Sequence, residues 1–293
     1  MPSRVRLRRH LISRCLAGNV ATPRENNLRH YRRFADRDPA YLLGLDPQGD
    51  WGPDAILDLM HRRVGVHPDP TYRTGVDRID PDRTLDALDA FAVRLAATAR
   101  DRAPVLCGTG HPARLLALHA SLVRALARVG CPVLLPALGT VLTVGTGAGP
   151  RPRVLRQRRG VLHLANPPAP PPGHPDHSSP EDLGQLTGAQ ADGPRPSAPA
   201  HSHSPLPVRA ALAALAADGS PPPALVIGDH GWVCAAGQAG VEAIGFADSN
   251  DPALFVGEAE GRVAVAVPLD DGLSANFYSP IARYILESAG LSA

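Results

Sequence analysis

The amino-acid sequence predicts an α/β protein of Rossmann-like architecture, with a mostly parallel sheet, a helical N-terminal portion and a Pro-rich irregular insertion. Near the C-terminus, three short apolar runs at residues 224–228, 243–247 and 263–267 are each long enough for a buried strand. Further upstream, an apolar run at 104–107, an apolar helix stripe and a second run at 133–135 form a β-α-β unit. A crossover helix between two neighbouring strands requires that the strands are parallel.

Residues 1–102 are expected to form the helical N-terminal portion. A helix should span 22–35, because a capping threonine is followed by proline and then by a glutamate three residues after the cap. The arginines of this helix, Arg24 among them, are expected to lie mostly in solvent. Further helices are predicted at 53–63 and 81–100 from their apolar periodicity and their starting prolines.

The rest of the chain divides into three parts. Residues 103–138 hold the first β-α-β unit, and 205–293 form the C-terminal half of the α/β domain with an Asp-rich site. Between them, 139–204 is expected to be a largely disordered insertion. Twelve prolines fall within 151–205, and such a segment buries too little apolar surface to offset its ordering entropy. Only 161–164 has the pattern of a strand.

The composition excludes several chemistries and partners. All 30 basic residues are arginine, so the chain has no phosphate-binding, Schiff-base or general-base lysine. The N-terminal arginines lack interleaved aromatic residues, and the C-terminal part is acidic, so no nucleic-acid partner is expected. No apolar run approaches the ~18 residues that cross a bilayer. Four widely spaced cysteines favour reduced thiols, and we expect a cytoplasmic protein without membrane contact.

Acidic residues follow each of the three C-terminal apolar runs. They are Asp229 after the first run, Asp248 and Asp251 after the second, and Asp270 and Asp271 after the third. In an open α/β sheet the ligand site lies beyond the carboxyl ends of the strands, so these side chains should gather at one edge. Such a group of carboxylates suits a hard divalent cation. The alternative is that each aspartate only stabilises its own turn.

An Asp-His pair stands directly after the first C-terminal run, between two glycines. Asp229 would bind a metal there, while His230 would donate or accept a proton. In the alternative interpretation, Asp229 caps the next helix and His230 packs beside Trp232.

A second glycine-rich turn, Gly108-Thr109-Gly110-His111, stands where a predicted strand leads into a helix. Glycines let the backbone approach an anion, and free amides at a helix N-terminus favour phosphate. A tight turn that needs glycine for its own shape is the alternative. In both interpretations His111 lies at the mouth of the turn.

Two further histidines, His201 and His203, are separated by one serine. In an extended segment both side chains point to the same side, a spacing that suits a metal or a phosphate oxygen. Their place at the end of the Pro-rich segment alternatively favours solvent-exposed histidines.

The sequence resembles a family of actinobacterial proteins called simply phosphatase, and the resemblance covers the whole chain. It is carried by the segments 18–26, 108–112, 201–205, 226–232, 245–261 and 267–271. Across about 139–200 the chain departs from the family pattern. The resemblance implies hydrolysis of a phosphate ester, and it adds His201 and His203 to the expected site.

We therefore expect metal-dependent hydrolysis of a small phosphomonoester, with Mg²⁺ as the preferred cation. The expected metal ligands are Asp229, Asp248, Asp270, Asp271 and His201. The expected phosphate-binding residues are Gly108, Thr109, Gly110 and His203, and the expected catalytic residues are His230, Asp229 and His111. The alternative is a non-catalytic binder of a phosphorylated metabolite or nucleotide. The sequence predicts no oligomeric state.

Overall fold

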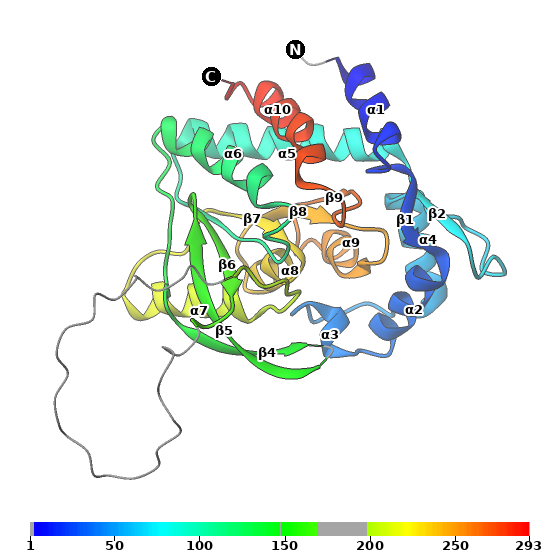
Figure 1. Cartoon of the computed structure of the whole chain (residues 1–293), viewed down its shortest axis with the longest axis horizontal. Helices are drawn as coiled ribbons and strands as arrows, with labels where there is room; N and C mark the ends of the chain where they lie inside the picture. The colour runs from blue at the N-terminus through cyan, green and yellow to red at the C-terminus, as the bar shows by residue number, and fades with distance from the viewer. Residues whose placement is uncertain (1–2, 147, 169–197, 293) are drawn as a thin grey trace, which may run out of the picture.

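The computed structural model of the chain describes residues 3–146, 148–168 and 198–292. Its centre is a sheet of four parallel strands in the order β3-β7-β8-β9 (Figure 1). The strands are β3 (Val105–Cys107), β7 (Leu225–Asp229), β8 (Ala243–Ala247) and β9 (Val265–Pro268). All their residues are buried, as continuous apolar runs in a parallel sheet require. The predicted mixed α/β class is confirmed, and so are the buried strands predicted at 104–107, 224–228, 243–247 and 263–267.

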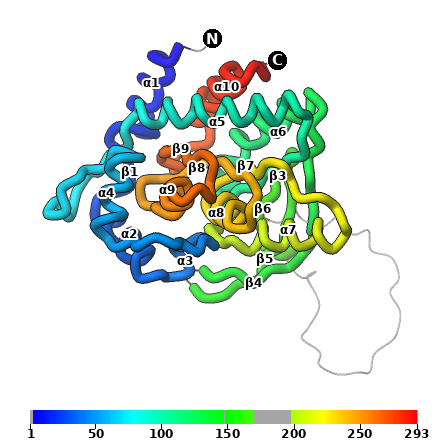
Figure 2. The backbone as a smooth tube through the Cα atoms, turned by 180° about the vertical axis from the view of Figure 1, so that it is seen from behind, coloured from blue at the N-terminus to red at the C-terminus, as the bar shows by residue number. Residues whose placement is uncertain are grey.

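Helices cover both faces of this sheet (Figures 1 and 2). On one face lie α5 (Pro81–Asp101), α6 (Leu116–Arg128) and α10 (Ser279–Ser288). On the other face lie α8 (His230–Gln238) and α9 (Pro252–Ala259), with α7 (Leu206–Ala217) packed beyond α8. None of the described helices combines the length and the apolar character that crossing a bilayer requires.

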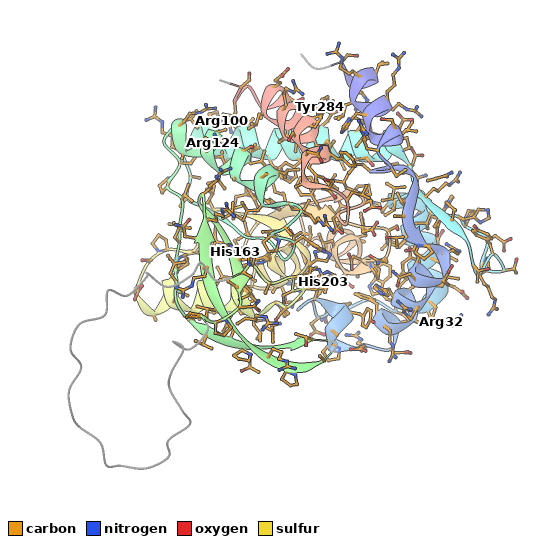
Figure 3. All side chains as sticks on the ribbon, viewed as in Figure 1. Arg32, Arg100, Arg124, His163, His203 and Tyr284 are labelled. Carbon is orange, nitrogen blue, oxygen red and sulfur yellow. The ribbon has the colours of Figure 1, made fainter. Side chains whose placement is uncertain are left out.

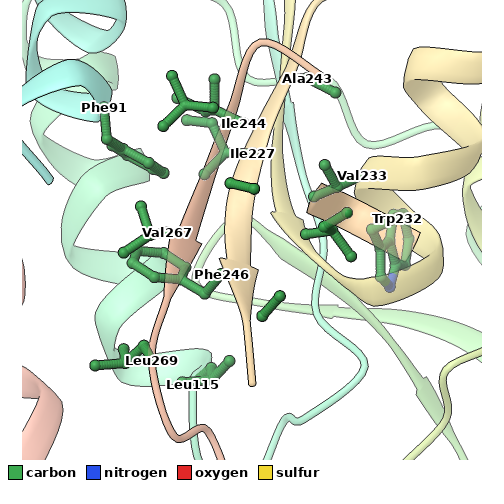
Figure 4. Packing of buried hydrophobic residues seen from close by; sticks show 14 of the residues in the cluster. Phe91, Leu115, Ile227, Trp232, Val233, Ala243, Ile244, Phe246, Val267 and Leu269 are labelled. Atoms are coloured by element: carbon green, nitrogen blue, oxygen red, sulfur yellow. The ribbon is translucent and has the colours of Figure 1, made fainter. Parts of the chain in front are cut away.

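The core is built from side chains that alternate across the sheet (Figure 4). Phe246 of β8 packs on Phe91 of α5, with their ring centroids 5.2 Å apart. Its neighbour Gly245 faces the other way, where a Cβ atom would come within 2.5 Å of the Val233 side chain of α8. Glycine is therefore required at 245 because α8 approaches the strand too closely for any side chain.

The N-terminal portion contains a two-stranded antiparallel sheet as well as helices. Strand β1 (Gly18–Pro23) pairs with β2 (Val76–Ile79). The helices are α1 (Arg4–Ser13), α2 (Arg24–Ala35), α3 (Pro39–Leu42) and α4 (Pro53–Arg63). The helices predicted at 53–63 and 81–100 are confirmed, and the side chain of Asp80 caps α5.

Two predictions about the first long helix are wrong. The helix begins at Arg24 without a side-chain cap, because Thr22 belongs to β1 and its hydroxyl donates instead to Asp248. Arg24 is fully buried, with its guanidinium 3.0 Å from a carboxylate oxygen of Asp77. A buried carboxylate needs a paired cation, and this pairing removes Arg24 from solvent.

The stretch 139–204 is more ordered than predicted. It forms a second, antiparallel sheet of β4 (Val141–Thr146), β5 (Gly149–Arg158) and β6 (Val161–Ala165). The strand predicted at 161–164 is confirmed, whereas the prediction of disorder is wrong for the first two strands. Pro150 and Pro152 are tolerated because they lie where β5 pairs with β4 alone. The remaining part of that prediction falls largely on 169–197, outside the described residues.

The two larger sheets meet at the outer edge of β3. Gly108 forms a parallel bridge with Leu162 of β6, and Val105 forms one with Val133. The strand predicted at 133–135 is therefore reduced to a single bridge, and the Rossmann-like description stays a prediction. The chain after β3 leads to α6 on one face of the sheet, whereas β7 leads directly into α8 on the other face. The residues that follow these two neighbouring strands therefore lie at the carboxyl edge of the sheet, where ligand sites of open α/β sheets occur.

Candidate metal centre

Four histidines meet at this carboxyl edge. They are His111 after β3, His230 after β7, and His201 and His203 between β6 and α7. The Nε2 atom of His201 lies 2.8 Å from Nε2 of His111 and 3.0 Å from Nε2 of His203. The ring of His203 stacks on that of His230, with centroids 3.8 Å apart. Figure 3 shows His203 near the centre of the molecule, whereas Arg32 and Arg100 lie at its edges.

The segment that carries His201 and His203 is held in place by its backbone. The amide of Ala200 donates to the carbonyl of Leu164 at 2.8 Å, which continues the β6 edge. The amide of Ser202 then donates to the carbonyl of Gly110 at 2.9 Å. Because the segment is extended, both imidazoles point to the same side, as the spacing in the sequence predicts.

The convergence of these ring nitrogens is typical of metal ligands. A neutral imidazole has one N–H and one lone pair, so a single nitrogen cannot satisfy two others at hydrogen-bond distance. Burial and the charge of His230 lower the pKa of His111 to about 3, and burial lowers the pKa of His203 well below its ordinary value. Both rings are therefore neutral near pH 7, which is the form that binds a metal.

His230 links the histidines to the carboxylates. It starts α8 with φ of 45°, a strained conformation for a residue with a side chain. Its Nδ1 lies 3.3 Å from Oδ1 of Asp229, while its Nε2 lies 2.8 Å from Oδ2 of Asp251 and 3.4 Å from Oδ2 of Asp271. Burial favours the neutral ring, but the carboxylates of Asp251 and Asp271 outweigh it and raise the pKa of His230 well above its ordinary value.

Both carboxylate oxygens of Asp229 are occupied by donors from the protein. Oδ2 accepts from the Thr109 hydroxyl at 2.5 Å, and Oδ1 accepts from the Gly110 amide at 2.6 Å. Burial opposes ionisation of this carboxyl, but the hydrogen bond and charge of His230 lower the pKa of Asp229 below its ordinary value. Asp229 occupies the N-cap position of α8 without capping it, so it orients His230 instead.

The glycine-rich turn after β3 does not offer free amides to an anion, and that expectation is wrong. The amide of Gly108 donates to Ile227 at 3.0 Å, and the amide of Thr109 donates to Leu162 at 2.9 Å. The amides of Gly110 and His111 are bound to side chains, and α6 begins only at Leu116. The glycines serve packing, because a Cβ atom at 108 would collide with the Trp232 ring and one at 110 with the Ser202 carbonyl.

The remaining predicted carboxylates differ in how far their oxygens are satisfied. Asp248 accepts from the Ser249 amide at 2.6 Å and from Thr22, and Asp270 accepts from the amides of Ala21 and Gly272. By contrast, Oδ2 of Asp271 is buried and has no hydrogen-bond partner among the described residues. Burial and the neighbouring Asp270 raise the pKa of Asp248 to about 7.

Two sets of side chains in the described structure bring their ligand atoms within 4.8 Å of one another. The first set is His111, His203 and His230, and the second is His230, Asp251 and Asp271. His201 lies against the first set through its Nε2. Of the predicted metal ligands, Asp271 and His201 are thus at the cluster, whereas Asp229, Asp248 and Asp270 belong to neither set.

Sequence reasoning missed the contribution of α2. The hydroxyl of Tyr31 donates to the Ser249 carbonyl at 2.7 Å, and the Ser249 hydroxyl donates to Oδ1 of Asn27 at 3.2 Å. His30 Nδ1 lies 2.9 Å from the Asn250 carbonyl. The available signal was the spacing of Arg24, Asn27 and Tyr31, which places polar groups on the buried face of the helix.

A cluster of histidine and carboxylate ligands at the strand ends of an α/β sheet is the kind of site that supports metal-assisted hydrolysis. The family model described as Phosphatase matches residues 2–293, and the chain belongs to this family. A protein of Streptomyces coelicolor named Phosphatase SCO2771 is 40% identical over 292 residues, which cover 99% of this chain and 97% of that protein. The resemblance predicted from the sequence is confirmed. No solved structure matches the chain.

Proposed function

We propose that the protein is a metal-dependent phosphatase that hydrolyses a small phosphomonoester at the histidine–aspartate cluster. Membership of the phosphatase family supports the class of reaction. The observation that supports a metal is the convergence of three ring nitrogens: Nε2 of His201 lies 2.8 Å from Nε2 of His111 and 3.0 Å from Nε2 of His203. Beside them, Oδ2 of Asp271 accepts no hydrogen bond from the described residues.

The charge of the site independently favours a metal. Five carboxyl groups surround the histidines, and none of them has an arginine as a hydrogen-bond or ion-pair partner in the described structure. They are Asp229, Asp248, Asp251, Asp270 and Asp271. A phosphomonoester is itself an anion, and in a buried site of low dielectric it would be repelled strongly by these groups. The His230 ring supplies a single positive charge, and a bound divalent cation would reduce the repulsion further.

The donor set favours a transition metal over the Mg²⁺ expected from the sequence. Imidazole nitrogens suit Zn²⁺, Mn²⁺, Fe²⁺ or Co²⁺, whereas magnesium prefers oxygen ligands and retains water. The expectation of magnesium depended on Asp229, Asp248 and Asp270, whose oxygens accept hydrogen bonds from the protein.

The residues then divide into ligands and groups that position them. Nε2 of His230 faces Asp251 and Asp271, and we assign His230 to the ligands on the condition that a metal displaces the Nε2 proton when it binds. Oδ1 of Asp229 lies 3.3 Å from Nδ1 of His230 and so fixes the orientation of that ring. Hydrogen bonds from Thr109 and Gly110 hold Asp229 in place. When bound, a divalent ion would polarise a phosphoryl oxygen and make a water molecule more acidic.

The test starts from protein stripped with a chelator and resupplied with Mn²⁺, Zn²⁺ or Mg²⁺. We expect hydrolysis of p-nitrophenyl phosphate or of a phosphorylated metabolite only after metal is added, with Mn²⁺ or Zn²⁺ better than Mg²⁺. His203→Gln should lower metal affinity by at least about 10-fold, the loss that even an outer-shell partner causes. His67→Gln, in the loop before β2, is the matched control and should bind metal as the wild type does.

Two results would contradict the proposal. Hydrolysis that persists in the stripped protein would remove the metal from the reaction. Binding of phosphorylated metabolites without turnover under any of the three metals would favour the alternative, a non-catalytic binder.

A further inference from the structure

We infer that the cluster is built for two metal ions, with the Asp271 carboxylate bridging them. This inference rests on the proposed metal dependence and deepens it. It assigns a nitrogen-rich position to His111, His201 and His203, and an oxygen-rich position to His230, Asp251 and Asp271.

The first reason is that the two oxygens of Asp271 face different histidines. Oδ1 lies 3.9 Å from Nε2 of His111, and Oδ2 lies 3.4 Å from Nε2 of His230. The Asp271 side chain is 8% exposed. Oδ2 accepts no hydrogen bond from the described residues, and its 3.4 Å contact with the His230 ring is an ion-pair distance only, so we assign this oxygen to a metal that would take the place of the ring proton.

The second reason is that the ligand atoms separate into two groups with different chemistry. Around Nε2 of His201, the nearest atoms are ring nitrogens at 2.8 and 3.0 Å. Around Nε2 of His230, the nearest atoms are carboxylate oxygens, that of Asp251 at 2.8 Å and that of Asp271 at 3.4 Å. His230 belongs to both sets of convergent ligand atoms, because its ring also stacks on that of His203. We assign it to the oxygen-rich position because its Nε2 faces the two carboxylates.

The third reason is the balance of charge. One divalent ion offers two positive charges against five carboxyl groups and an incoming anionic phosphate. The five are Asp229, Asp248, Asp251, Asp270 and Asp271. Metal binding would ionise these carboxyl groups and remove the extra proton of His230, so that two ions would set four positive charges against five negative ones. Two ions held about 3.5–4 Å apart form the arrangement that phosphatases use on both oxygens of an in-line displacement.

The experiment counts manganese ions and measures the magnetic coupling between them. Stripped protein is titrated with Mn²⁺, bound metal is quantified by elemental analysis, and the electron paramagnetic resonance spectrum is recorded. We expect two Mn²⁺ per chain in the wild type, with the multiline spectrum of an exchange-coupled pair. Asp271→Asn should abolish the coupling. Asp251→Asn should leave one uncoupled Mn²⁺ at the histidine position.

Asp218→Asn, at the exposed end of α7, is the matched control and should keep two coupled ions. Circular dichroism checks that each variant is folded. If Asp271→Asn does not fold, the result for Asp251→Asn decides the test. A wild type that saturates at one Mn²⁺ with an isolated six-line spectrum would overturn the inference.

The outcomes separate this inference from the proposed function. Turnover of a phosphate ester with a single bound ion would leave the phosphatase standing and refute the second position. Two coupled ions without turnover of any phosphate ester would establish the two-ion centre and refute the phosphatase.

Discussion

Asp229 is a buried carboxylate that positions the histidine cluster and belongs to neither set of convergent ligand atoms. Its two oxygens are taken by Thr109, Gly110 and His230, which come from loops after two neighbouring strands. The residue therefore fixes both the turn that carries His111 and the ring of His230. The Asp229 side chain thus fixes the positions of His111 and His230, which are 119 residues apart in the sequence.

We predict that Asp229→Asn weakens Mn²⁺ binding by ~10–100-fold while the protein stays folded. An amide offers one acceptor oxygen instead of two, so either Gly110 or Thr109 loses its partner, at a cost of about 1–3 kcal/mol. Calorimetric titration measures the affinity and urea unfolding the stability. Thr109→Ser, which keeps the hydroxyl, is the control, and wild-type affinity in Asp229→Asn would refute the positioning role.

Asp248 provides a prediction about pH. Burial and Asp270 raise the pKa of its carboxyl from an ordinary value of 3.8 to about 7 in the folded protein. The folded state therefore holds this proton more tightly than the unfolded state does. Metal-free wild type should lose stability relative to Asp248→Asn as the pH rises from about 4 to about 7. Urea unfolding of both proteins at pH 4.5 and 7.5 checks the sign, and a constant difference would contradict it.

At the scale of elements, the site depends on how closely α8 meets the segment 201–204. Gly231 lies in the first turn of α8, and a Cβ atom there would come within 2.5 Å of the His203 carbonyl. Gly110 has the same function from the turn after β3, against the Ser202 carbonyl. Glycine on both sides thus lets an extended segment pass between a turn and a helix with its imidazoles aimed inward.

We predict that Gly231→Ala costs about 1–3 kcal/mol of stability, as overpacking of a dense interior usually does. It should also weaken metal binding, because the backbone that carries His203 must move. Gly145→Ala is the matched control, since no atom lies within 4 Å of a Cβ atom built there, and it should change stability by less than about 0.5 kcal/mol. Equal behaviour of the two variants would contradict the packing explanation.

At the scale of the whole molecule, the cluster joins parts that are distant in the sequence. The residues that follow β3, β7, β8 and β9 include His111, His230, Asp251 and Asp271. The segment before α7 supplies His201 and His203, and β1 holds the carboxyls of Asp248 and Asp270 through Thr22 and Ala21. A cation at the centre would therefore tie together elements from across the chain.

We predict that a bound metal raises the unfolding temperature of the entire protein. A ligand that binds only the native state stabilises it by ~2.7 kcal/mol at a hundredfold excess over its dissociation constant. Thermal unfolding with and without Mn²⁺ measures the shift, and the double variant His203→Gln with Asp271→Asn should lose it. If none of Mn²⁺, Zn²⁺ and Mg²⁺ changes the unfolding temperature of the wild type, the metal would have to be removed from the proposed function.

The fold was predictable where its cause is local. The buried strands at 225–229, 243–247 and 265–268 are short apolar runs that end in turn residues, and this length and these ends favour strands over helices. Because the strands are parallel, the aspartates after them had to share one edge of the sheet. The strands at 141–158 escaped prediction because proline is unfavourable only where both edges of a strand are paired, and pairing is not a local property.

By itself, the sequence placed the aspartates at the carboxyl ends of parallel strands, and the spacing of His201 and His203 placed their side chains on one side of the segment. Only the tertiary structure decided which of their atoms are free. Asp229 accepts hydrogen bonds from Thr109 and Gly110, whereas one oxygen of Asp271 accepts none from the part of the chain that the structure describes. The difference arises from hydrogen bonds between residues more than a hundred positions apart in the chain. Hydrogen-bond partners supplied by the tertiary structure thus decide which carboxylate oxygens stay available at the cluster.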